Sequence, residues 1–160
     1  MSITDIEFRH PGAGESDAIS ALARRSKAHW GYSAEFMASC RDELTFTVEQ
    51  CVSANIWVAA RGDDVLGFYL LTGDGAVGEL AAMFVEPAHI GTGVGRALLR
   101  HARGQADARG IRQLYVDADP HSEDFYAHHG ARRVGDTPSG SIPGRVLPRM
   151  VFTGVGRRGD

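Results

Sequence analysis

The sequence has few cysteines and no long apolar run, and these two absences exclude several classes of protein. Its longest apolar stretch, residues 76–85, is interrupted by Gly78 and Glu79 and is too short to span a bilayer. The N-terminus has no basic region followed by an apolar one, which is the pattern of a secretory leader. The two cysteines, Cys40 and Cys51, lack the spacing of metal ligands or of a redox motif. We therefore expect a soluble, cytoplasmic protein that has reduced, buried thiols, binds no metal and does not contact a membrane.

No run of Lys or Arg is long enough to form a nucleic-acid-binding patch. The formal net charge of −3 is nevertheless distributed unevenly along the chain. Residues 1–88 carry 13 acidic and 6 basic side chains, whereas residues 89–160 carry 7 acidic and 11 basic ones. The basic second half suits a small phosphorylated ligand better than a nucleic acid, although ordinary scatter of surface charge explains the same counts equally well.

The length and composition are those of one globular domain with an ordinary core. The chain has 160 residues, of which 43% are hydrophobic and 23% charged. Glycine is the exception, because 20 of the 160 residues, or 12.5%, are glycine, whereas a share of roughly 7% is usual. We expect a single domain over residues 1–153 and a loose tail over residues 154–160.

Hydrophobic periodicity predicts a helical first third, after one opening strand, and a strand-rich remainder. Helices are expected to begin at Ser16 or Glu15, at Ser33 and at Thr47, where Gln50 completes a capping box. Later helices are expected to end at Arg109 and to run from Pro120 to His129. Seven strands are expected, over residues 3–9, 56–61, 65–72, 76–85, 113–117, 131–135 and 146–153.

The order of these elements predicts an α/β (α+β) fold. Tight turns join the three strands between residues 56 and 85, which indicates an antiparallel meander. The strand, helix and strand that follow imply a right-handed parallel crossover. The expected architecture is a mixed, mostly antiparallel twisted sheet of six to seven strands flanked by helices.

The most informative segment combines a strand, a loop with glycines at positions 91, 93 and 95, and the start of a helix. Glycines let the backbone approach an anion, and the amides of the first helical turn are donors, so this segment predicts a phosphate-binding loop. A Walker A loop is excluded because Arg96 and Ala97 stand where Lys and Ser or Thr are required. A dinucleotide fingerprint is disfavoured by the G-x-G-x-G spacing, and a dinucleotide-binding enzyme stays the weakest alternative.

Three ordered blocks together resemble the GCN5-related N-acetyltransferase (GNAT) family. They are Glu-Leu-(x)3-Phe-Val-x-Pro from Glu79, Gly-x-Gly-Val-Gly-Arg-Ala-Leu-Leu from Gly91, and Asp-Pro-(x)4-Phe-Tyr-(x)3-Gly-Ala from Asp119. The resemblance covers roughly residues 56–153. It implies one N-acetyltransferase domain that transfers the acetyl group of acetyl-CoA to a primary amine of a small molecule or protein. One position departs from the family, because Ile90 stands where members have Arg or Gln.

The same resemblance implies which residues bind the cofactor. Backbone amides of the loop would hold the pyrophosphate of acetyl-CoA, and the preceding strand would contact its acetyl group and pantetheine arm. Asp119 stands where many members have Asn, and its preferred role is to cap the following helix. The implied cofactor-binding residues are Met83, Phe84, Val85, Ile90, Gly91, Thr92, Gly93, Val94, Gly95, Arg96 and Asp119.

Two residues are candidates for proton transfer. Glu79 precedes the apolar residues 80–85, and an apolar environment suits a carboxylate to accept a proton; the alternative is a side chain that points to solvent. Tyr126 occupies the family's usual general-acid position; the alternative is an amphipathic side chain packed at a helix edge. Retention of both residues favours an enzyme over a non-catalytic acyl-CoA-binding sensor on the same fold.

The acceptor would be bound by the early helices and the last hairpin, again by resemblance. Trp30 and Tyr32 lie at a helix break, where aromatic side chains wall a pocket or simply plug the gap between two helices. Arg145 lies in the loop before the last strand and is able to pair with a carboxylate of the acceptor. The fold is also compatible with a homodimer.

Overall fold

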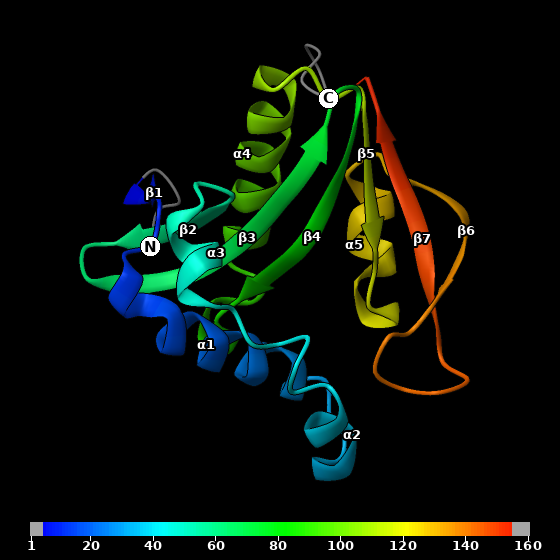
Figure 1. Ribbon diagram of the computed structural model, residues 1–160, viewed down its shortest axis with the longest axis horizontal. Helices are drawn as coiled ribbons and strands as arrows, with labels where there is room; N and C mark the ends of the chain where they lie inside the picture. The colour runs from blue at the N-terminus through cyan, green and yellow to red at the C-terminus, as the bar shows by residue number, and fades with distance from the viewer. Residues whose placement is uncertain (1–4, 155–160) are drawn as a thin grey trace. The chain divides into compact units, whose positions relative to one another are not determined.

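Seven strands form one hydrogen-bonded sheet within residues 5–154, the part of the chain that this computed structural model describes. Their order is β1-β2-β3-β4-β5-β7-β6 (Figure 1). The pair β4–β5 is parallel, whereas β1–β2, β2–β3, β5–β7 and β6–β7 are antiparallel, which confirms the predicted mixed sheet. The strands are β1 (Glu7–Arg9), β2 (Ile56–Arg61), β3 (Asp64–Asp74), β4 (Val77–Val85), β5 (Gln113–Asp117), β6 (Arg132–Pro138) and β7 (Val146–Thr153).

Helices begin where their capping residues predict. The Ser33 hydroxyl accepts a hydrogen bond from the Phe36 amide at 3.1 Å, and Thr47 and Gln50 form the expected capping box. The helix expected from Pro120 is instead a 3-10 turn, Pro120–Ser122, that leads into α5. The α-helices are α1 (Ser16–Ala28), α2 (Ala34–Ser39), α3 (Val48–Val52), α4 (Val94–Ala108) and α5 (Glu123–His128).

The described chain forms two compact units. The first comprises residues 5–70 and 82–99, and the second comprises residues 71–81 and 100–154. Strands β3 and β4 and helix α4 each contribute residues to both units. Each unit is described separately below.

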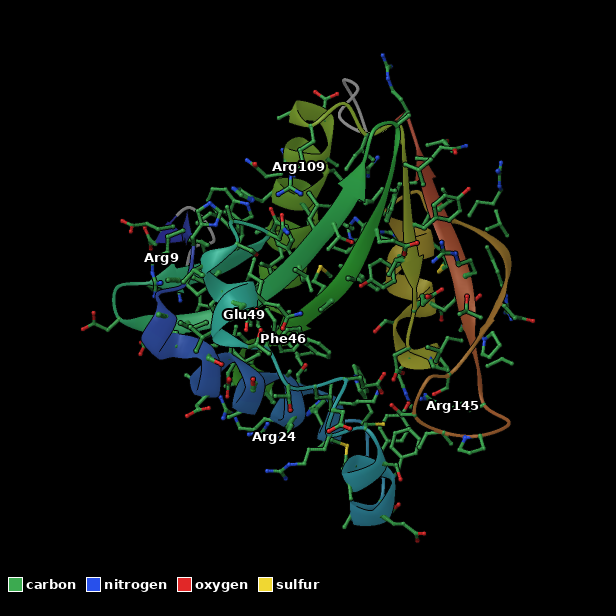
Figure 2. The ribbon with its side chains drawn as sticks, viewed as in Figure 1. Arg9, Arg24, Phe46, Glu49, Arg109 and Arg145 are labelled. Carbon is green, nitrogen blue, oxygen red and sulfur yellow. The ribbon has the colours of Figure 1, made fainter. Side chains whose placement is uncertain are left out.

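An aromatic cluster forms the centre of the first unit. The ring of Phe46, which is labelled in Figure 2, meets the ring of Phe68 edge to face with centroids 5.0 Å apart. The Phe84 centroid lies 5.7 Å from that of Phe68. Such arrangements stabilise beyond the burial of area alone. The backbone amide of Phe46 is satisfied by the hydroxyl of Ser20 on α1 at 2.8 Å. A buried hydrogen bond therefore joins helix α1 to this cluster.

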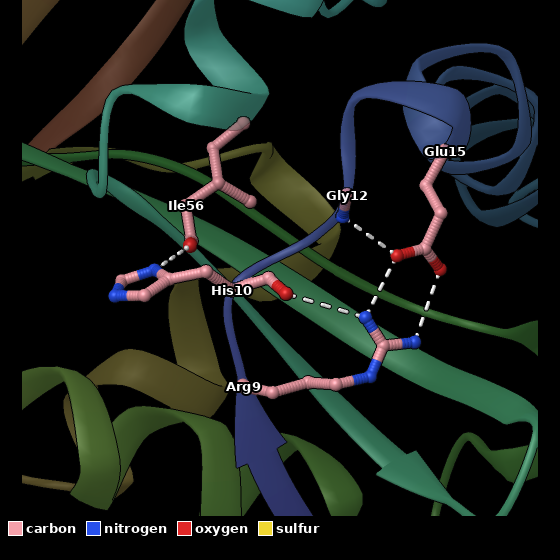
Figure 3. A network of polar contacts seen from close by, with 5 residues as sticks. All are labelled: Arg9, His10, Gly12, Glu15 and Ile56. Carbon is pink, nitrogen blue, oxygen red and sulfur yellow. Dashed lines mark hydrogen bonds and ion pairs between the residues drawn. The ribbon is translucent and has the colours of Figure 1, made fainter.

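A polar network ties β1 to its neighbours in the first unit (Figure 3). Arg9 contacts both carboxylate oxygens of Glu15 at 2.7 and 3.0 Å, and Glu15 also accepts the Gly12 amide at 2.9 Å. The hydrogen bond from Arg9 lowers the pKa of Glu15. The His10 ring lies 2.8 Å from the carbonyl oxygen of Ile56 on β2. These contacts join β1, the start of α1 and the start of β2.

Gly67 permits a close approach between β3, β4 and α4. A Cβ atom at Gly67 would lie 2.7 Å from the carbonyl oxygen of Phe84 and 2.8 Å from a methyl group of Leu98. Real Cβ atoms do not make contacts this short, so the fold requires glycine here. The consequence is that β4 reaches the following loop with its backbone packed directly on β3.

The core of the second unit is built on Phe152 of β7. Its ring meets Tyr126 of α5 edge to face at 6.3 Å between centroids, and the Arg103 guanidinium of α4 lies 4.8 Å from its centroid. Arg103 also donates to the carbonyl oxygen of His129 at 3.0 Å, at the end of α5. Both helical segments therefore pack on one face of β7.

Candidate functional site

The predicted phosphate-binding loop is a tight turn between β4 and α4 in the first unit. The amide of Glu86 donates to the carbonyl oxygen of Leu66 on β3 at 2.8 Å, which fixes the point where the strand ends. A 3-10 turn, Pro87–His89, follows. Gly91 and Gly93 both have positive φ, +83° and +97°, a conformation that side chains with a Cβ rarely adopt. Glycine is therefore required by the path of the loop itself.

This path presents backbone donors at the start of α4. The first helical hydrogen bond runs from the Ala97 amide to the Gly93 carbonyl oxygen at 3.0 Å. In helix geometry, the amides of the preceding turn point out of the helix end and carry its positive partial charge. The Thr92 hydroxyl donates to the carbonyl oxygen of His89 at 2.6 Å and so stabilises the turn from within. The arrangement is able to bind an anion through its backbone.

Side chains of the predicted cofactor residues have different surroundings. Val94 is buried at 2% exposure and belongs to the core, whereas Thr92 and Arg96 are exposed. Ile90 is half-buried. Phe84 belongs to the aromatic cluster. Met83, Val85 and Gly95 are half-buried as well.

An ion pair that the sequence did not predict anchors the loop to α1. Arg25 contacts both carboxylate oxygens of Glu86, from its Nε at 2.9 Å and from Nη2 at 2.7 Å. This two-point contact raises the pKa of Arg25. The two residues are 61 positions apart, so no local sequence pattern reveals the contact.

The predicted aromatic break between α1 and α2 is present, and Gly31 with φ +89° forms it. Tyr32 stacks on Phe36 with centroids 4.1 Å apart, and the Lys27 ammonium lies 5.5 Å from the Tyr32 ring. Trp30 meets His29 edge to face at 5.1 Å and is 38% exposed. The two predicted acceptor residues thus have separate aromatic partners.

Tyr126 is buried in the second unit. Its exposure is 5%, and burial, together with the negative charge of Asp119, raises the pKa of its hydroxyl far above the ordinary value near 10. The phenol therefore remains protonated throughout the physiological range.

Asp119 caps the turn that leads to α5, in the role preferred from the sequence. Its Oδ1 accepts the His121 amide at 2.9 Å and lies 2.9 Å from the His121 ring nitrogen Nδ1. Its Oδ2 lies 3.5 Å from Nη2 of Arg145, in the loop between β6 and β7 (Figure 2). The structure thus brings two predicted site residues together, and Arg145 contacts a carboxylate of its own chain.

The apolar environment expected around Glu79 is wrong. Arg149 of β7 contacts both of its carboxylate oxygens, from Nη1 at 2.9 Å and from Nη2 at 2.5 Å. The same Nη1 lies 3.1 Å from Asp117 of β5. The expectation failed because residues 80–85 describe only the strand of Glu79 itself, whereas its neighbours come from β5 and β7. We call this group the Arg149 cluster; its members are Glu79, Tyr115, Asp117, Thr137 and Arg149.

The candidate residues are therefore divided between the units. The loop residues, the β4 residues 83–85 and the aromatic break belong to the first unit. Glu79, Asp119, Tyr126 and Arg145 belong to the second. Among the described residues, no group of His, Cys, Asp and Glu is arranged to hold a metal ion, and no helix is long and apolar enough to cross a membrane.

Comparison with known proteins agrees with the sequence blocks. The model of the acetyltransferase (GNAT) domain family matches residues 53–130. Comparison with curated proteins gives no match. The resemblance to the GNAT family is thereby confirmed over these residues.

Solved structures show the same fold. A GCN5-related N-acetyltransferase from Rhodopseudomonas palustris has 23% identity and a TM-score of 0.77, over 96% of this chain and 98% of that one. The PaiA N-acetyltransferase from Thermoplasma acidophilum, solved with coenzyme A, has 21% identity and a TM-score of 0.72, over 96% and 99%. N-acetylglutamate synthase from Neisseria gonorrhoeae, solved with coenzyme A and L-arginine, has 18% identity and a TM-score of 0.66, over 95% of this chain and 34% of that one.

Proposed function

We propose that the protein is an N-acetyltransferase that transfers the acetyl group of acetyl-CoA to a primary amine. The observation that carries the proposal is the loop between β4 and α4. In this loop Gly91 and Gly93 have positive φ, and the loop leads directly into a 15-residue helix whose first amides are able to bind an anion. The loop lies within the segment that matches the GNAT model. Two of the three solved structures described above contain coenzyme A, which supports the same cofactor here.

Backbone amides, rather than charged side chains, are the main proposed ligands of the cofactor's pyrophosphate. Ile90 has no polar atom to add at the position where the family has Arg or Gln. The Thr92 hydroxyl already donates within the loop. Arg96 is exposed on the first turn of α4 and supplies a further positive charge. We therefore expect the binding of acetyl-CoA to depend more on the conformation of the loop than on any one of its side chains.

The proposed reaction is a direct attack on the thioester. The amine nitrogen forms a bond to the acetyl carbonyl carbon, and the bond from that carbon to sulfur breaks. The nitrogen loses one proton, which Glu79 accepts directly or through a water molecule, and the sulfur gains one proton, which Tyr126 supplies. The products are the N-acetyl amine and free coenzyme A.

Tyr126 acts under a constraint that its burial imposes. Its pKa exceeds 10, whereas an ordinary thiol has a pKa of about 8.5, so complete proton transfer before C–S cleavage would be uphill by more than roughly 2 kcal/mol. We therefore propose that Tyr126 first donates a hydrogen bond to the sulfur and transfers its proton as the bond breaks. A buried phenol that never ionises at neutral pH is always available for this role.

Two acceptor-binding regions are proposed, each within its own unit: the aromatic break, with Trp30 and Tyr32, in the first, and Arg145 in the second. The stacked rings of Tyr32 and Phe36 offer a flat apolar surface beside the Lys27 ammonium. Arg145 is held near Asp119, so a carboxylate of the acceptor would exchange with Asp119 for the same guanidinium.

The test is the release of free coenzyme A from acetyl-CoA in the presence of a panel of amines. The panel contains aliphatic monoamines, polyamines, α-amino acids and a lysine-containing peptide, and mass spectrometry identifies the acetylated product. The proposal predicts amine-dependent thiol release with at least one class. Calorimetric binding of acetyl-CoA without thiol release for any class would favour an acyl-CoA-binding sensor, and binding of NAD alone would overturn the cofactor assignment.

A further inference from the structure

We propose that Arg149 is a positioning residue for Glu79, one that holds the carboxylate in the orientation from which it accepts the proton of the amine. The inference rests on the proposed function, in which Glu79 is the base, and it assigns a role to a residue that the sequence did not reveal. Arg149 contacts no substrate in this proposal and acts only through Glu79.

The contact crosses three strands of the second unit. In the sheet, Glu79 of β4 pairs with Tyr115 of β5, and Arg149 of β7 pairs with Asp117 of β5. The guanidinium therefore extends across β5 and along it to meet a carboxylate two strands away. It reaches both oxygens of Glu79, with Nη1 at 2.9 Å and Nη2 at 2.5 Å, which is the two-point geometry that fixes the plane of a carboxylate.

Arg149 is itself held in place by the other members of the cluster. Its guanidinium lies 4.5 Å from the centroid of the Tyr115 ring, and its Nη1 also contacts Asp117 at 3.1 Å. Asp117 in turn accepts a hydrogen bond from the Thr137 hydroxyl of β6 at 2.7 Å. Glu79 is thus attached to a side chain that Tyr115 and Asp117 of β5 contact directly, and Thr137 of β6 holds Asp117 in turn.

The arrangement leaves Glu79 able to react. A carboxylate has about four lone-pair positions, and the guanidinium occupies one on each oxygen. The remaining positions are open to a proton donor or a water molecule, and the Glu79 side chain is 38% exposed. Without Arg149, a carboxylate with this exposure would rotate freely. Loss of a correct orientation alone is able to slow an enzyme by about a hundredfold.

The second unit contains a matched control for the chemistry of the contact. Arg133 of β6 also bridges two carboxylates, with Nη1 3.2 Å from Glu123 and Nη2 2.5 Å from Asp136. Neither partner is a candidate for proton transfer. A substitution of Arg133 removes a charge and two ion pairs, as a substitution of Arg149 does, but it leaves Glu79 in place.

The experiment compares Arg149→Met, Arg149→Lys and Glu79→Gln, alone and combined, with Arg133→Met as the control. For Arg149→Met we expect kcat to fall by about 10- to 100-fold while the KM for acetyl-CoA stays the same. Arg149→Lys retains the charge but has only one contact point, so its kcat should lie between that of the wild type and that of Arg149→Met. Added guanidinium ion should restore part of the activity of Arg149→Met and none of that of Glu79→Gln. Arg133→Met should remain within about twofold of the wild type.

The double variant distinguishes positioning from a structural role. If Arg149 acts through Glu79, Arg149→Met combined with Glu79→Gln is no slower than Glu79→Gln alone. Losses that multiply in the double variant, or an Arg149→Met protein that is folded and fully active, would overturn the proposal. If Arg149→Met does not fold, the same comparison is made with Arg149→Lys. Full activity of Glu79→Gln would overturn it as well while leaving acetyl transfer intact, whereas a wild type that acetylates no amine would refute the proposed function itself.

Discussion

The loop between β4 and α4 and the Arg149 cluster are built in opposite ways. In the loop, the path of the backbone is specified by Gly91 and Gly93, and the side chains are mostly exposed or half-buried. In the cluster, the backbone is ordinary sheet, and function would depend on where Glu79 and Arg149 place their charged atoms. A binding site made of backbone should tolerate most side-chain changes but no change of φ. A site made of side chains should show the reverse.

The largest effect is expected at the buried phenol of the second unit. Tyr126→Phe keeps the ring that packs against Phe152 but removes the only proton that the side chain can donate. Turnover should fall by about 10- to 1000-fold, with little change in the affinity for acetyl-CoA. Steady-state kinetics with saturating acetyl-CoA measure the effect. Unchanged turnover would remove Tyr126 from the mechanism.

A smaller effect, on binding instead of turnover, is expected at the loop. Gly91→Ala adds a Cβ that no other atom approaches within 4 Å. The whole effect of the substitution therefore comes from the positive φ of +83°. Such strain costs about 1–2 kcal/mol, which corresponds to a dissociation constant for acetyl-CoA raised about 5- to 30-fold.

Gly140→Ala is the matched control for Gly91→Ala. It lies in the loop between β6 and β7 and likewise meets nothing within 4 Å. Calorimetry should show no change in the affinity for acetyl-CoA in this variant. Equal affinities for the wild type and Gly91→Ala would show that the loop conformation is not what holds the cofactor.

A selective effect is expected at Arg145, which lies 3.5 Å from Asp119. Arg145→Ala should raise the KM for acidic acceptors about fivefold, the value of one charge-assisted contact of about 1 kcal/mol. Neutral acceptors provide the control within the same variant. An equal rise for all acceptors would indicate that Arg145 only ties its loop to Asp119.

The smallest effect is expected from restoring the family's residue at position 90. Ile90→Gln adds a polar side chain to a loop that already binds through its backbone. The affinity for acetyl-CoA should increase about twofold to threefold, since one added hydrogen bond has a net value of about 0.5 kcal/mol. Calorimetry measures the gain in affinity. A tenfold or greater gain would contradict the view that this loop binds acetyl-CoA mainly through its backbone.

The sequence revealed the loop and missed the cluster for a physical reason. Helix caps at Ser33 and Thr47 and the glycines of the loop act on residues within a few positions of themselves, so their patterns are visible locally. Arg149 and Glu79 are 70 positions apart and meet only because β5 brings β4 and β7 to its two sides. No periodicity encodes that pairing.

The same limit applies to the surroundings of Arg145, which the sequence did not reveal. That Arg145 pairs with a carboxylate of the acceptor stays a prediction; in the structure its guanidinium lies 3.5 Å from the carboxylate of Asp119. The residue that contacts the proposed base is Arg149, which lies four positions further along, within strand β7.

The most direct test is one series of calorimetric titrations with acetyl-CoA. It compares the affinities of the wild type, Gly91→Ala, Glu79→Gln and Tyr126→Phe, and so tests whether the loop binds the cofactor while Glu79 and Tyr126 act only in the chemical step. The wild type should bind one acetyl-CoA per chain, Gly91→Ala should bind it about 5- to 30-fold more weakly, and the other two variants should bind it as the wild type does. A wild type that does not bind acetyl-CoA, or variants of Glu79 and Tyr126 that lose as much affinity as Gly91→Ala, would contradict this division.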